Sequence, residues 1–426
     1  MLDNEATAAA ATSAATVPRR VAWLTIALLF AGWIVNYIDT FTITVALPSI
    51  GQTLTLDKTQ QGLVLTVFFF TYTLCQIPGG MLADRIGSRR ALTLALIAWA
   101  VFTALTGLVS NYSLLLVVRG LYGIAAAMFP GAVAKAISER TSPAQRMTAN
   151  GVVLTANAIG SGLAPLVAAP TILAIGWRHS FVAVAGLGIV MAALIWFLLP
   201  RPKVSAGGDE TATAGGPAVR LGRVLRSPAI WLCGLAFFGF DLVGWGLISW
   251  APSYLLDSRG IGLAQTGVLV AIPWFIAAAS TVIGGVLFDR YFHDKPRLLI
   301  VPSMVATAVL LWFMLNASST GAFVTFESIA MAFMWLSFMP IFGLPLRLLR
   351  GQVAGLANST VNFGGQVAGT LAPIAMGWLA QQYSFGAAFA LLLAGAAVGA
   401  LASIWIPQRP ADFASTLPAE ALASAE

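Results

Sequence analysis

Twelve long apolar stretches constrain the fold of this chain more than any other feature. A helix of ~20 apolar residues crosses the hydrocarbon core of a bilayer, and inside lipid the backbone polar groups of a lone segment can bond only to one another. Because 58% of the 426 residues are hydrophobic and 9% are charged, we predict an all-α integral membrane protein with twelve transmembrane helices. They lie roughly at 21–47, 61–82, 91–110, 113–136, 148–172, 179–199, 228–250, 265–288, 298–316, 320–343, 353–379 and 386–406.

The placement of basic residues predicts the orientation. If the N-terminus is cytoplasmic, 18 of the 23 Lys and Arg fall in cytoplasmic segments. Lys58, Arg178 and Arg259 fall outside, and Arg119 and Lys135 lie within spans. Lys and Arg concentrate in cytoplasmic loops, so we expect a multi-pass protein of the cell inner membrane with both termini cytoplasmic. The same asymmetry accounts for the basic pI without a nucleic-acid partner.

Cysteine and histidine are too sparse to indicate a disulfide framework or a metal site. Cys75 and Cys233 both lie inside apolar stretches, and His179 and His293 are far apart. We therefore expect no metal and no cofactor. The sequence ahead of the first span has no apolar segment with a cleavage site, so no removable signal peptide is expected.

Matching residues about 205 positions apart divide the chain into two similar halves. Duplicated six-helix halves are typical of secondary transporters, whose site lies at the midplane between the halves. The expected domains are a disordered cytoplasmic tail (1–20), a six-helix bundle (21–200), a cytoplasmic linker (201–227), a second six-helix bundle (228–408) and a cytoplasmic tail (409–426). The matches pair Asp39 with Asp241, Pro48 with Pro252, Asp84 with Asp289, Asn157 with Asn362, Gly160 with Gly365 and Ala164-Pro165 with Ala372-Pro373.

Four charged side chains lie inside the apolar stretches, where each costs roughly 2.5–3.5 kcal/mol on insertion scales. They are Asp39, Arg119, Asp241 and Glu327, in the first, fourth, seventh and tenth spans. Helix-rise arithmetic places all four from the middle of the membrane outward. Arg119 is the only arginine well inside a span, and its planar guanidinium suits a carboxylate or sulfonate.

Structural alternatives stand beside these functional interpretations. Asp39 and Arg119 could form an ion pair that only fixes helix packing, although the polar neighbours of Asp39 favour an aqueous cavity. Glu327 is nearer the membrane rim, where a structural or surface role fits equally well. Trp245, Trp250 and Trp274 could line a cavity, but anchoring at the interface is the default for tryptophan in a membrane protein. We expect the Phe68–Phe70 run to face lipid or pack. The glycines of the fifth and eleventh spans are expected at helix contacts: Gly151, Gly160, Gly162, Gly355, Gly364, Gly365 and Gly369.

A charged hairpin between the second and third spans reads Gly80-x-Leu82-Ala83-Asp84-Arg85-x-Gly87-x-Arg89-Arg90, and a weaker copy ends in Asp289-Arg290. This pattern resembles the loop signature of the major facilitator superfamily. The resemblance implies two bundles that rock in alternating access around a cavity lined by spans 1, 4, 7 and 10. It also implies a gate role for the hairpin, in which Asp84 stabilises the closed inner face and the arginines hold the loop inside.

Three further segments resemble the anion:cation symporters of that superfamily, which take up organic anions such as sugar acids and aromatic acids, usually with protons. They are Trp245–Leu255 followed by Arg259-Gly260, Gly176–Phe181, and Asn358-x-x-x-Asn362-Phe363-Gly364-Gly365. By this resemblance, Asp39 matches a proton-linked acid and Arg119 an anion-binding arginine. Thr40 stands where an arginine is common, and Ala126 where a glutamate is common. Proton coupling would then depend on Asp39, helped by Asp241.

The sequence therefore predicts a monomeric secondary active transporter, not an enzyme, that imports a small organic anion by proton symport. The expected substrate-binding residues are Arg119, Tyr37, Thr40, Asn157 and Asn362. The alternative is a proton-coupled drug or metabolite exporter, since Asp39–Pro48 and Arg119-x-x-x-Gly123 resemble exporter motifs. Against it, Ala164-Pro165 replaces the Gly-Pro of the antiporter signature. A sensor is not favoured, because nothing resembling a signalling domain is appended.

Overall fold

The computed structural model describes residues 18–201, 226–348, 351–409 and 412–413. The predicted tails (1–20 and 409–426) and linker (201–227) lie mostly outside the described residues. The domain boundaries drawn there stay predictions.

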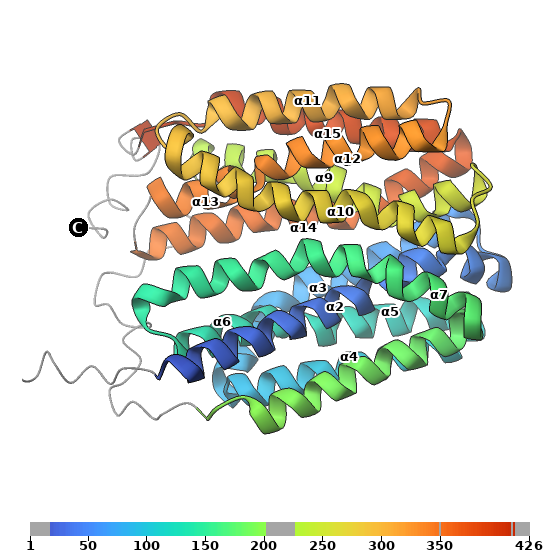
Figure 1. Cartoon of the computed structure of the whole chain (residues 1–426), viewed down its shortest axis with the longest axis horizontal. Coiled ribbons are helices and arrows are strands. Elements are labelled where there is room, and N and C mark those ends of the chain that lie inside the picture. The colour runs from blue at the N-terminus through green and yellow to red at the C-terminus, as the bar shows by residue number, and fades with distance from the viewer. Residues whose placement is uncertain (1–17, 202–225, 349–350, 410–411, 414–426) are drawn as a thin grey trace, which may run out of the picture.

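The first half of the chain forms a bundle of six helical spans (Figure 1). Two of the spans merge in one long helix, which Gly176 interrupts at φ 75° and ψ 160°. L-residues with a side chain rarely adopt this positive φ, so glycine suits the junction. The break falls between the predicted spans 148–172 and 179–199. The helices are α2 (Arg19–Leu54), α3 (Lys58–Ile86), α4 (Ser88–Leu108), α5 (Tyr112–Ala126), α6 (Phe129–Arg140) and α7 (Pro143–Leu198).

The second half repeats this arrangement beside the first, with the two bundles forming the upper and lower parts of Figure 1. Asn358, Asn362 and Gln366 make α14 more polar, and it is not among the ten helical segments of the described chain that are long and apolar enough to cross a membrane. The helices are α9 (Pro228–Asp257), α10 (Leu263–Leu287) with the π-helical turn η1 (Phe288–Phe292), α11 (Arg297–Leu315), α12 (Thr320–Leu336), α13 (Phe338–Leu348), α14 (Gly351–Gln382) and α15 (Phe385–Trp405).

The fourth span of each half is interrupted at an equivalent place. The first segment ends at Ala126 in α5 and at Leu336 in α12, four residues before Pro130 and Pro340. Proline has no N–H to donate to the carbonyl four residues earlier, and its ring clashes with that carbonyl. Prolines elsewhere, such as Pro48 in α2, are accommodated without an interruption. The two breaks are therefore a shared feature of the fourth spans. They separate the short helix α6 from α5 in the first half and α13 from α12 in the second half.

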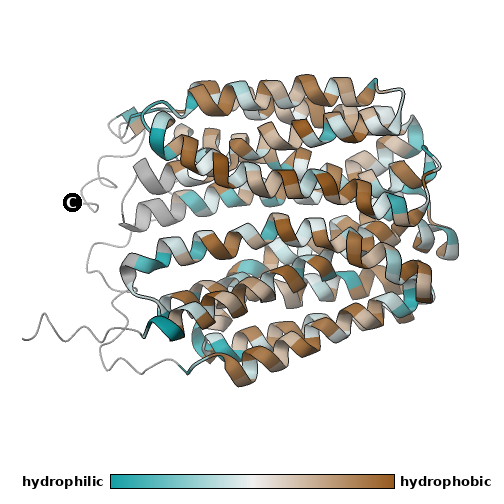
Figure 2. Ribbon diagram, in the orientation of Figure 1, coloured by the Kyte–Doolittle hydropathy of each residue, from teal (hydrophilic) through white to brown (hydrophobic). Residues whose placement is uncertain are grey.

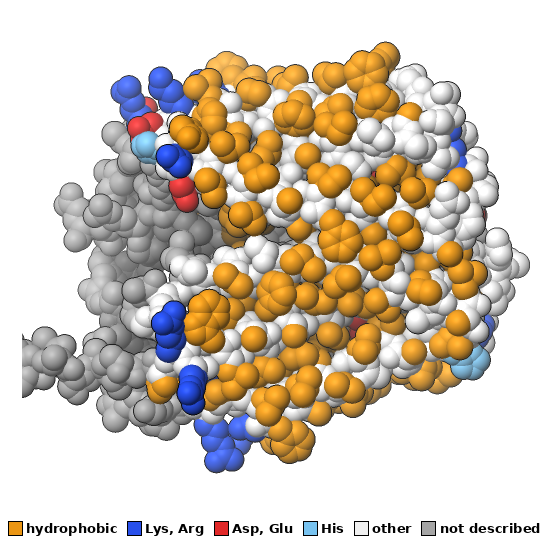
Figure 3. Space-filling view, viewed as in Figure 1, with side chains coloured by type: hydrophobic (Ala, Val, Ile, Leu, Met, Phe, Trp, Pro, Cys, Tyr) orange, Lys and Arg blue, Asp and Glu red, His pale blue; other side chains and the backbone are white. Residues whose placement is uncertain are grey.

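On the face shown in Figures 2 and 3, an apolar belt lies between two more polar ends. Large apolar side chains such as Ile77, Phe197 and Trp405 are more than two-thirds exposed, as expected of surfaces that contact lipid. Lys and Arg gather at the end of the molecule where α2 begins. Following the predicted orientation, we call this the inner end and the opposite one the outer end.

The two halves pack closely at the outer end. Lys58 on α3 forms an ion pair with Asp257 at the end of α9, and its N–H donates to Gln381 Oε1 at 3.0 Å. One turn further along α3, a Cβ added to Gly62 would lie 2.5 Å from the carbonyl oxygen of Pro373 on α14. The backbones of α3 and α14 are therefore in direct contact across the two halves, and the space between the halves is closed at the outer end.

The three basic residues that break the orientation rule all have specific partners at the outer end. Lys58 pairs with Asp257 as described. Arg178 donates to the carbonyl of Val109 at 2.6 Å, just beyond α4. Arg259 donates to the carbonyl of Ala317 at 2.6 Å, just beyond α11. The two arginines satisfy carbonyls left unpaired at helix ends, and they do so on equivalent third spans of the two halves.

Candidate substrate-binding cavity

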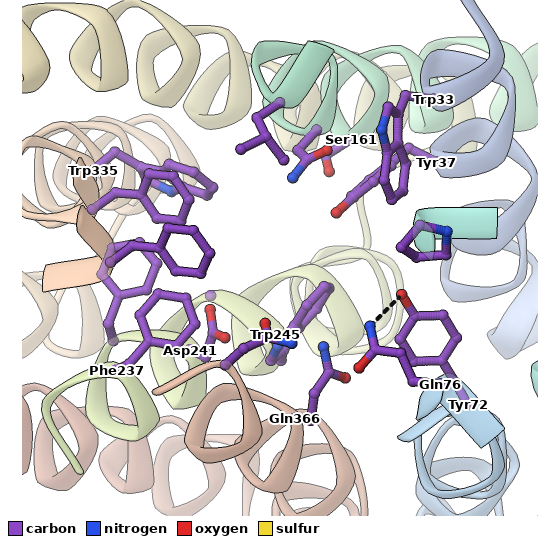
Figure 4. A pocket seen from close by; sticks show the side chains of 18 of the residues that line it. Trp33, Tyr37, Tyr72, Gln76, Ser161, Phe237, Asp241, Trp245, Trp335 and Gln366 are labelled. Carbon is purple, nitrogen blue, oxygen red and sulfur yellow. Dashed lines mark hydrogen bonds between the residues drawn. The ribbon is translucent and has the colours of Figure 1, made fainter. Parts of the chain in front are cut away.

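A cavity of about 430 Å³ lies between the two halves (Figure 4). This volume falls in the range of small-molecule sites. Its lining includes Pro130 and Ala134 of α6 and Phe338 and Phe342 of α13, so the cavity extends into the inner half of the molecule. The polar lining residues are Tyr37, Tyr72, Gln76, Asn157, Ser161, Asp241, Asn358, Ser359, Asn362 and Gln366.

Four of the five predicted substrate-binding residues lie on this cavity or on a smaller pocket beside it. Tyr37, Asn157 and Asn362 line the cavity. Thr40 lines the small pocket, of about 60 Å³, together with Tyr37. The two spaces share Trp33, Tyr37, Tyr72, Trp245 and Gln366, so the small pocket continues the cavity.

Arg119, the fifth predicted residue, lies just behind the wall of the small pocket. Its guanidinium carbon is 4.7 Å from the ring centre of Tyr122 and 5.3 Å from that of Phe68. Phe68 lines the small pocket, as does Thr40, whose Oγ1 is 2.9 Å from the hydroxyl of Tyr122. A single layer of side chains therefore separates the guanidinium from the pocket.

The buried guanidinium of Arg119 is incompletely satisfied. The side chain is only 1% exposed, and its Nε–H has no hydrogen-bond partner among the described residues. Leaving a buried polar donor unpaired costs free energy, and each such group in a folded protein calls for an explanation. The Nε–H of Arg119 therefore lacks an acceptor in this conformation, and the side-chain layer separates it from the small pocket.

Asp39 faces away from both spaces. It is completely buried, and Thr103 Oγ1 on α4 lies 2.7 and 2.9 Å from its two carboxylate oxygens. Asp39 and Arg119 interact electrostatically, but the ion pairs of the described residues do not join them directly. The prediction that polar neighbours put Asp39 in an aqueous cavity is wrong for this conformation, because α2 turns the carboxylate toward α4.

Asp241 does reach the cavity from α9. Its carboxylate packs against α14 so closely that a Cβ added to Gly365 would lie 2.0 Å from Asp241 Oδ2. Among the described lining residues it is the one charged side chain. Asp241 and Asp39 are thus equivalent in the repeat, but only Asp241 lines the cavity in this state.

Glu327 on α12 lines neither space. It is 2% exposed, and its Oε2 has no hydrogen-bond partner within the described chain. The surface alternative for Glu327 is therefore wrong, because neighbouring helices cover it.

Sequence reasoning gave the wrong default for the aromatic residues of the cavity. Trp245 and Trp274 line the cavity, which is the alternative to the interfacial anchoring expected by default. Trp250 was given the same role, yet it is buried and donates Nε1–H to the carbonyl of Pro373 at 3.0 Å. In the Phe68–Phe70 run, only Phe70 is exposed, while Phe68 and Phe69 line the small pocket. The available signal was helical spacing, since aromatic and polar residues recur every three or four positions on these spans.

Helix contacts explain most of the glycines. A Cβ at Gly160 would meet Tyr37 Cβ at 2.6 Å, and one at Gly364 would meet the carbonyl oxygen of Gly234 at 2.2 Å. Gly162, Gly365 and Gly369 also have close neighbours. Gly151 is the exception, since nothing lies within 4 Å of its added Cβ. Gly355 lies in a part of α14 whose side chains are outside the described residues.

Comparison with known proteins settles the family. A family model described as Major Facilitator Superfamily matches residues 29–369. The chain belongs to the Major Facilitator Superfamily. The predicted all-α membrane fold with two bundles is confirmed, and the chain is not that of an enzyme.

Three of its relatives carry the names of organic-anion transporters. The probable sulfoacetate transporter of Cupriavidus necator is 30% identical, with 88% of this chain and 91% of that protein covered. The hexuronate transporter of Bacillus subtilis is 26% identical, with 88% and 91% covered. The probable L-galactonate transporter of Escherichia coli is 27% identical, with 92% and 90% covered.

A solved structure shares the superfamily fold. It is a bacterial homologue of the human lysosomal transporter Spinster, in an inward-facing and unoccupied conformation. The TM-score is 0.76 at 19% sequence identity, with 95% of this chain and 97% of that chain covered. At 19% identity, this similarity shows the fold alone.

The superfamily hairpin lies at the inner end, away from the cavity. Gly80 packs against Gly131, whose added Cβ would be 2.8 Å from Gly80 Cα, and Gly87 joins α3 to α4 at φ 86°. Asp84 has a side chain that is 72% exposed, with Lys135 Nζ 3.8 Å from its Oδ1. Each of these contacts stays within the first half.

The remaining hairpin residues and the second copy have no part in the cavity. Arg89 lies 5.0 Å over the ring of Trp196, and Arg90 borders the lipid-facing groove between α4 and α7, while Arg85 is exposed. In η1, Asp289 precedes Arg290, which lies 5.6 Å over the ring of Tyr291. The gate role of both copies stays a prediction.

Proposed function

We propose that this chain imports a small organic anion, a carboxylate or sulfonate, by alternating access coupled to protons. The observation that carries the proposal is the buried Arg119 guanidinium, whose Nε–H is unpaired one side-chain layer behind the small pocket. The names of the relatives support the substrate class, since hexuronate, galactonate and sulfoacetate are all organic anions. A guanidinium fork pairs well with such groups.

Access to Arg119 requires rearrangement of the side-chain layer that covers it. The Thr40–Tyr122 contact at 2.9 Å and the ring of Phe68 lie between the guanidinium and the small pocket. In the outer-open state, displacement of this layer lets the anion meet Arg119. Tyr37, Thr40, Asn157 and Asn362 then supply hydrogen bonds to the rest of the substrate.

Proton coupling is assigned to Asp39, with Asp241 as the second acid. A proton on Asp39 removes a buried negative charge that otherwise competes with the substrate for Arg119. Thr103 hydrogen-bonds to Asp39 and holds it on the α4 side. Release of the proton to the inner side completes the cycle, after which the empty carrier returns.

The test is uptake and counterflow in proteoliposomes, after a thermal-shift screen of organic anions on purified protein. Arg119→Ala and Arg119→Lys should abolish substrate binding. Asp39→Asn should stop proton-driven accumulation and still allow counterflow exchange. Glu327→Gln is the matched control, because Glu327 is an equally buried acid that lines neither space. Normal accumulation by Asp39→Asn would show that the coupling assignment is wrong.

Proton-coupled export of lipophilic cations is the second candidate. The observation that favours it is Asp241, the one charged side chain among the described lining residues, set among aromatic rings. Aromatic faces and carboxylates both attract organic cations. Saturable binding of lipophilic cations, with no binding of any anion in the screen, would replace the import proposal by this one.

A further inference from the structure

One side of the cavity is built almost entirely from aromatic rings of the second half. We call this surface the aromatic wall. Each ring lies within about 6 Å of another member, measured between ring centres, so the surface is continuous. Its members are Phe237, Phe240, Trp274, Trp335, Phe338 and Phe342.

The first half supplies polar groups on the other side of the cavity, and Asp241, Asn358, Ser359 and Asn362 line it from α9 and α14 of the second half. Tyr37, Tyr72 and Gln76 face the cavity from α2 and α3, on the opposite side from Phe237 and Trp335 in Figure 4. The small pocket that leads to Arg119 lies on this side, since it shares Tyr37 and Tyr72 with the cavity, and its lining combines Asn36, Thr40 and Gln366 with aromatic rings. The cavity is therefore two-sided, with the anion-binding end opposite the aromatic wall.

Asp241 reinforces this orientation. It lies one helical turn from Phe237 on α9, so its carboxylate borders the wall. A second anionic group of a substrate would be repelled there, whereas an uncharged ring would not. Charge and shape thus favour one orientation of a ring-bearing anion in the cavity. Its anionic group points toward Arg119, and its ring lies against the aromatic wall.

From this arrangement we infer that the substrate is a monoanion whose carboxylate or sulfonate is attached to an aromatic ring. The inference rests on the proposed anion transport and narrows its substrate class. A ring can stack offset or edge-on against the wall. A polyhydroxylated acid would instead place several hydroxyl groups against rings whose only hydrogen-bonding groups are the indole N–H donors of Trp274 and Trp335, and the hydroxyls left unpaired would lose affinity.

The experiment measures binding of benzoate, benzenesulfonate and gluconate to the full-length chain by calorimetry or competition. All three are monoanions, so charge is matched. Either ring-bearing anion should bind at least ~10-fold more tightly than gluconate, from the ring contacts. Cyclohexanecarboxylate separates ring stacking from bulk hydrophobicity and should bind more weakly than benzoate.

Variants locate the effect at the wall. Phe342→Leu and Phe338→Leu keep apolar volume but remove a ring, so they should reduce the preference for benzoate over gluconate several-fold. Phe70→Leu is the matched control because Phe70 is 51% exposed and lines neither the cavity nor the small pocket, and it should leave the preference unchanged.

The outcomes distinguish this inference from the proposed function. Tighter binding of gluconate than of benzoate, or a preference unaffected by both wall variants, would overturn the aromatic assignment and leave anion transport intact. Absence of binding and transport for every anion would overturn both.

Discussion

Gly62→Ala should shift the transporter away from its outer-closed state. Gly62 on α3 packs against the backbone of α14, and a Cβ there would lie 2.5 Å from the carbonyl oxygen of Pro373 and 3.0 Å from Ile374 Cα. These neighbours are backbone atoms of the other half, so side-chain rotation cannot relieve the overlap. The collision disappears when the halves separate at the outer end.

The size of the effect follows from this geometry. Overpacking a tight contact by one methyl group costs about 1–3 kcal/mol. Since the cost applies to the outer-closed state alone, it changes the ratio of the two states by about 5- to 150-fold. The fold of each half is untouched, because the atoms close to the added Cβ belong to the opposite half.

Cysteine labelling from the outer side measures this ratio. Thr66 lies one turn from Gly62, and its Oγ1 donates to the carbonyl of Thr370 across the same contact at 2.9 Å. Thr66→Cys, in a background lacking Cys75 and Cys233, is therefore covered until the outer end opens. With a membrane-impermeant maleimide, its labelling rate should rise about fivefold or more in the Gly62→Ala variant.

Gly151→Ala is the control for this prediction. It also replaces a helical glycine, but nothing lies within 4 Å of its added Cβ. Both substitutions share the gain in helix propensity, so only the contact between halves differs. Equal labelling rates in the two variants would refute the reasoning.

Two further predictions concern ion pairs at opposite ends. Lys58→Ala and Asp257→Ala should each raise outer labelling of the same cysteine by no more than about fivefold, because the pair is 23% and 29% exposed and worth about 0.2–1 kcal/mol. The double variant should add little to either single change; a fully additive result would mean that the pair does not act as a unit. Arg140→Ala should lower the free energy of unfolding in detergent by about 3–5 kcal/mol, because the change removes a buried charge from its partners. The Arg140 side chain is 1% exposed, and its guanidinium donates to Glu139 Oε2 at 2.7 Å, to Ser88 Oγ at 2.9 Å and to the carbonyl of Pro200 at 2.7 Å. Scanning fluorimetry compares the melting temperature of this variant with that of Arg90→Ala, and equal melting temperatures would contradict the structural role of Arg140.

The spans were predictable because their signal is long and local. Ten of the twelve predicted stretches coincide, to within two residues, with a helix or part of one, and the junction at Gly176 lies between two of them. The stretches 113–136 and 320–343 each cover two helices, because the breaks after α5 and α12 were not predicted. The repeat was equally visible, since Asp39 and Asp241 stand at matching positions. Arg119 could be selected without a structure because a single guanidinium inside an apolar stretch is costly.

The direction in which each side chain points was not predictable. Asp39 and Thr40 are neighbours, yet Asp39 contacts Thr103 on α4 while Thr40 lines the small pocket. Successive helical residues differ by about 100° in direction, so an error of one residue in the rotation of α2 exchanges their environments. The environment of Trp245 was also not predictable from its residue type, since an indole suits a membrane interface and a cavity wall alike.

The close contact between Asp241 and Gly365 constrains which residues can occupy these two positions in related sequences. The Cβ of any larger residue at 365 would lie 2.0 Å from Asp241 Oδ2 and 2.7 Å from Phe237 Cε1. A larger residue can therefore replace glycine at position 365 only if the acid at 241 is replaced and the ring at 237 moves or gives way to a smaller side chain. In an alignment of homologues, glycine at this place should co-occur with the cavity acid, and the three positions should covary during divergence.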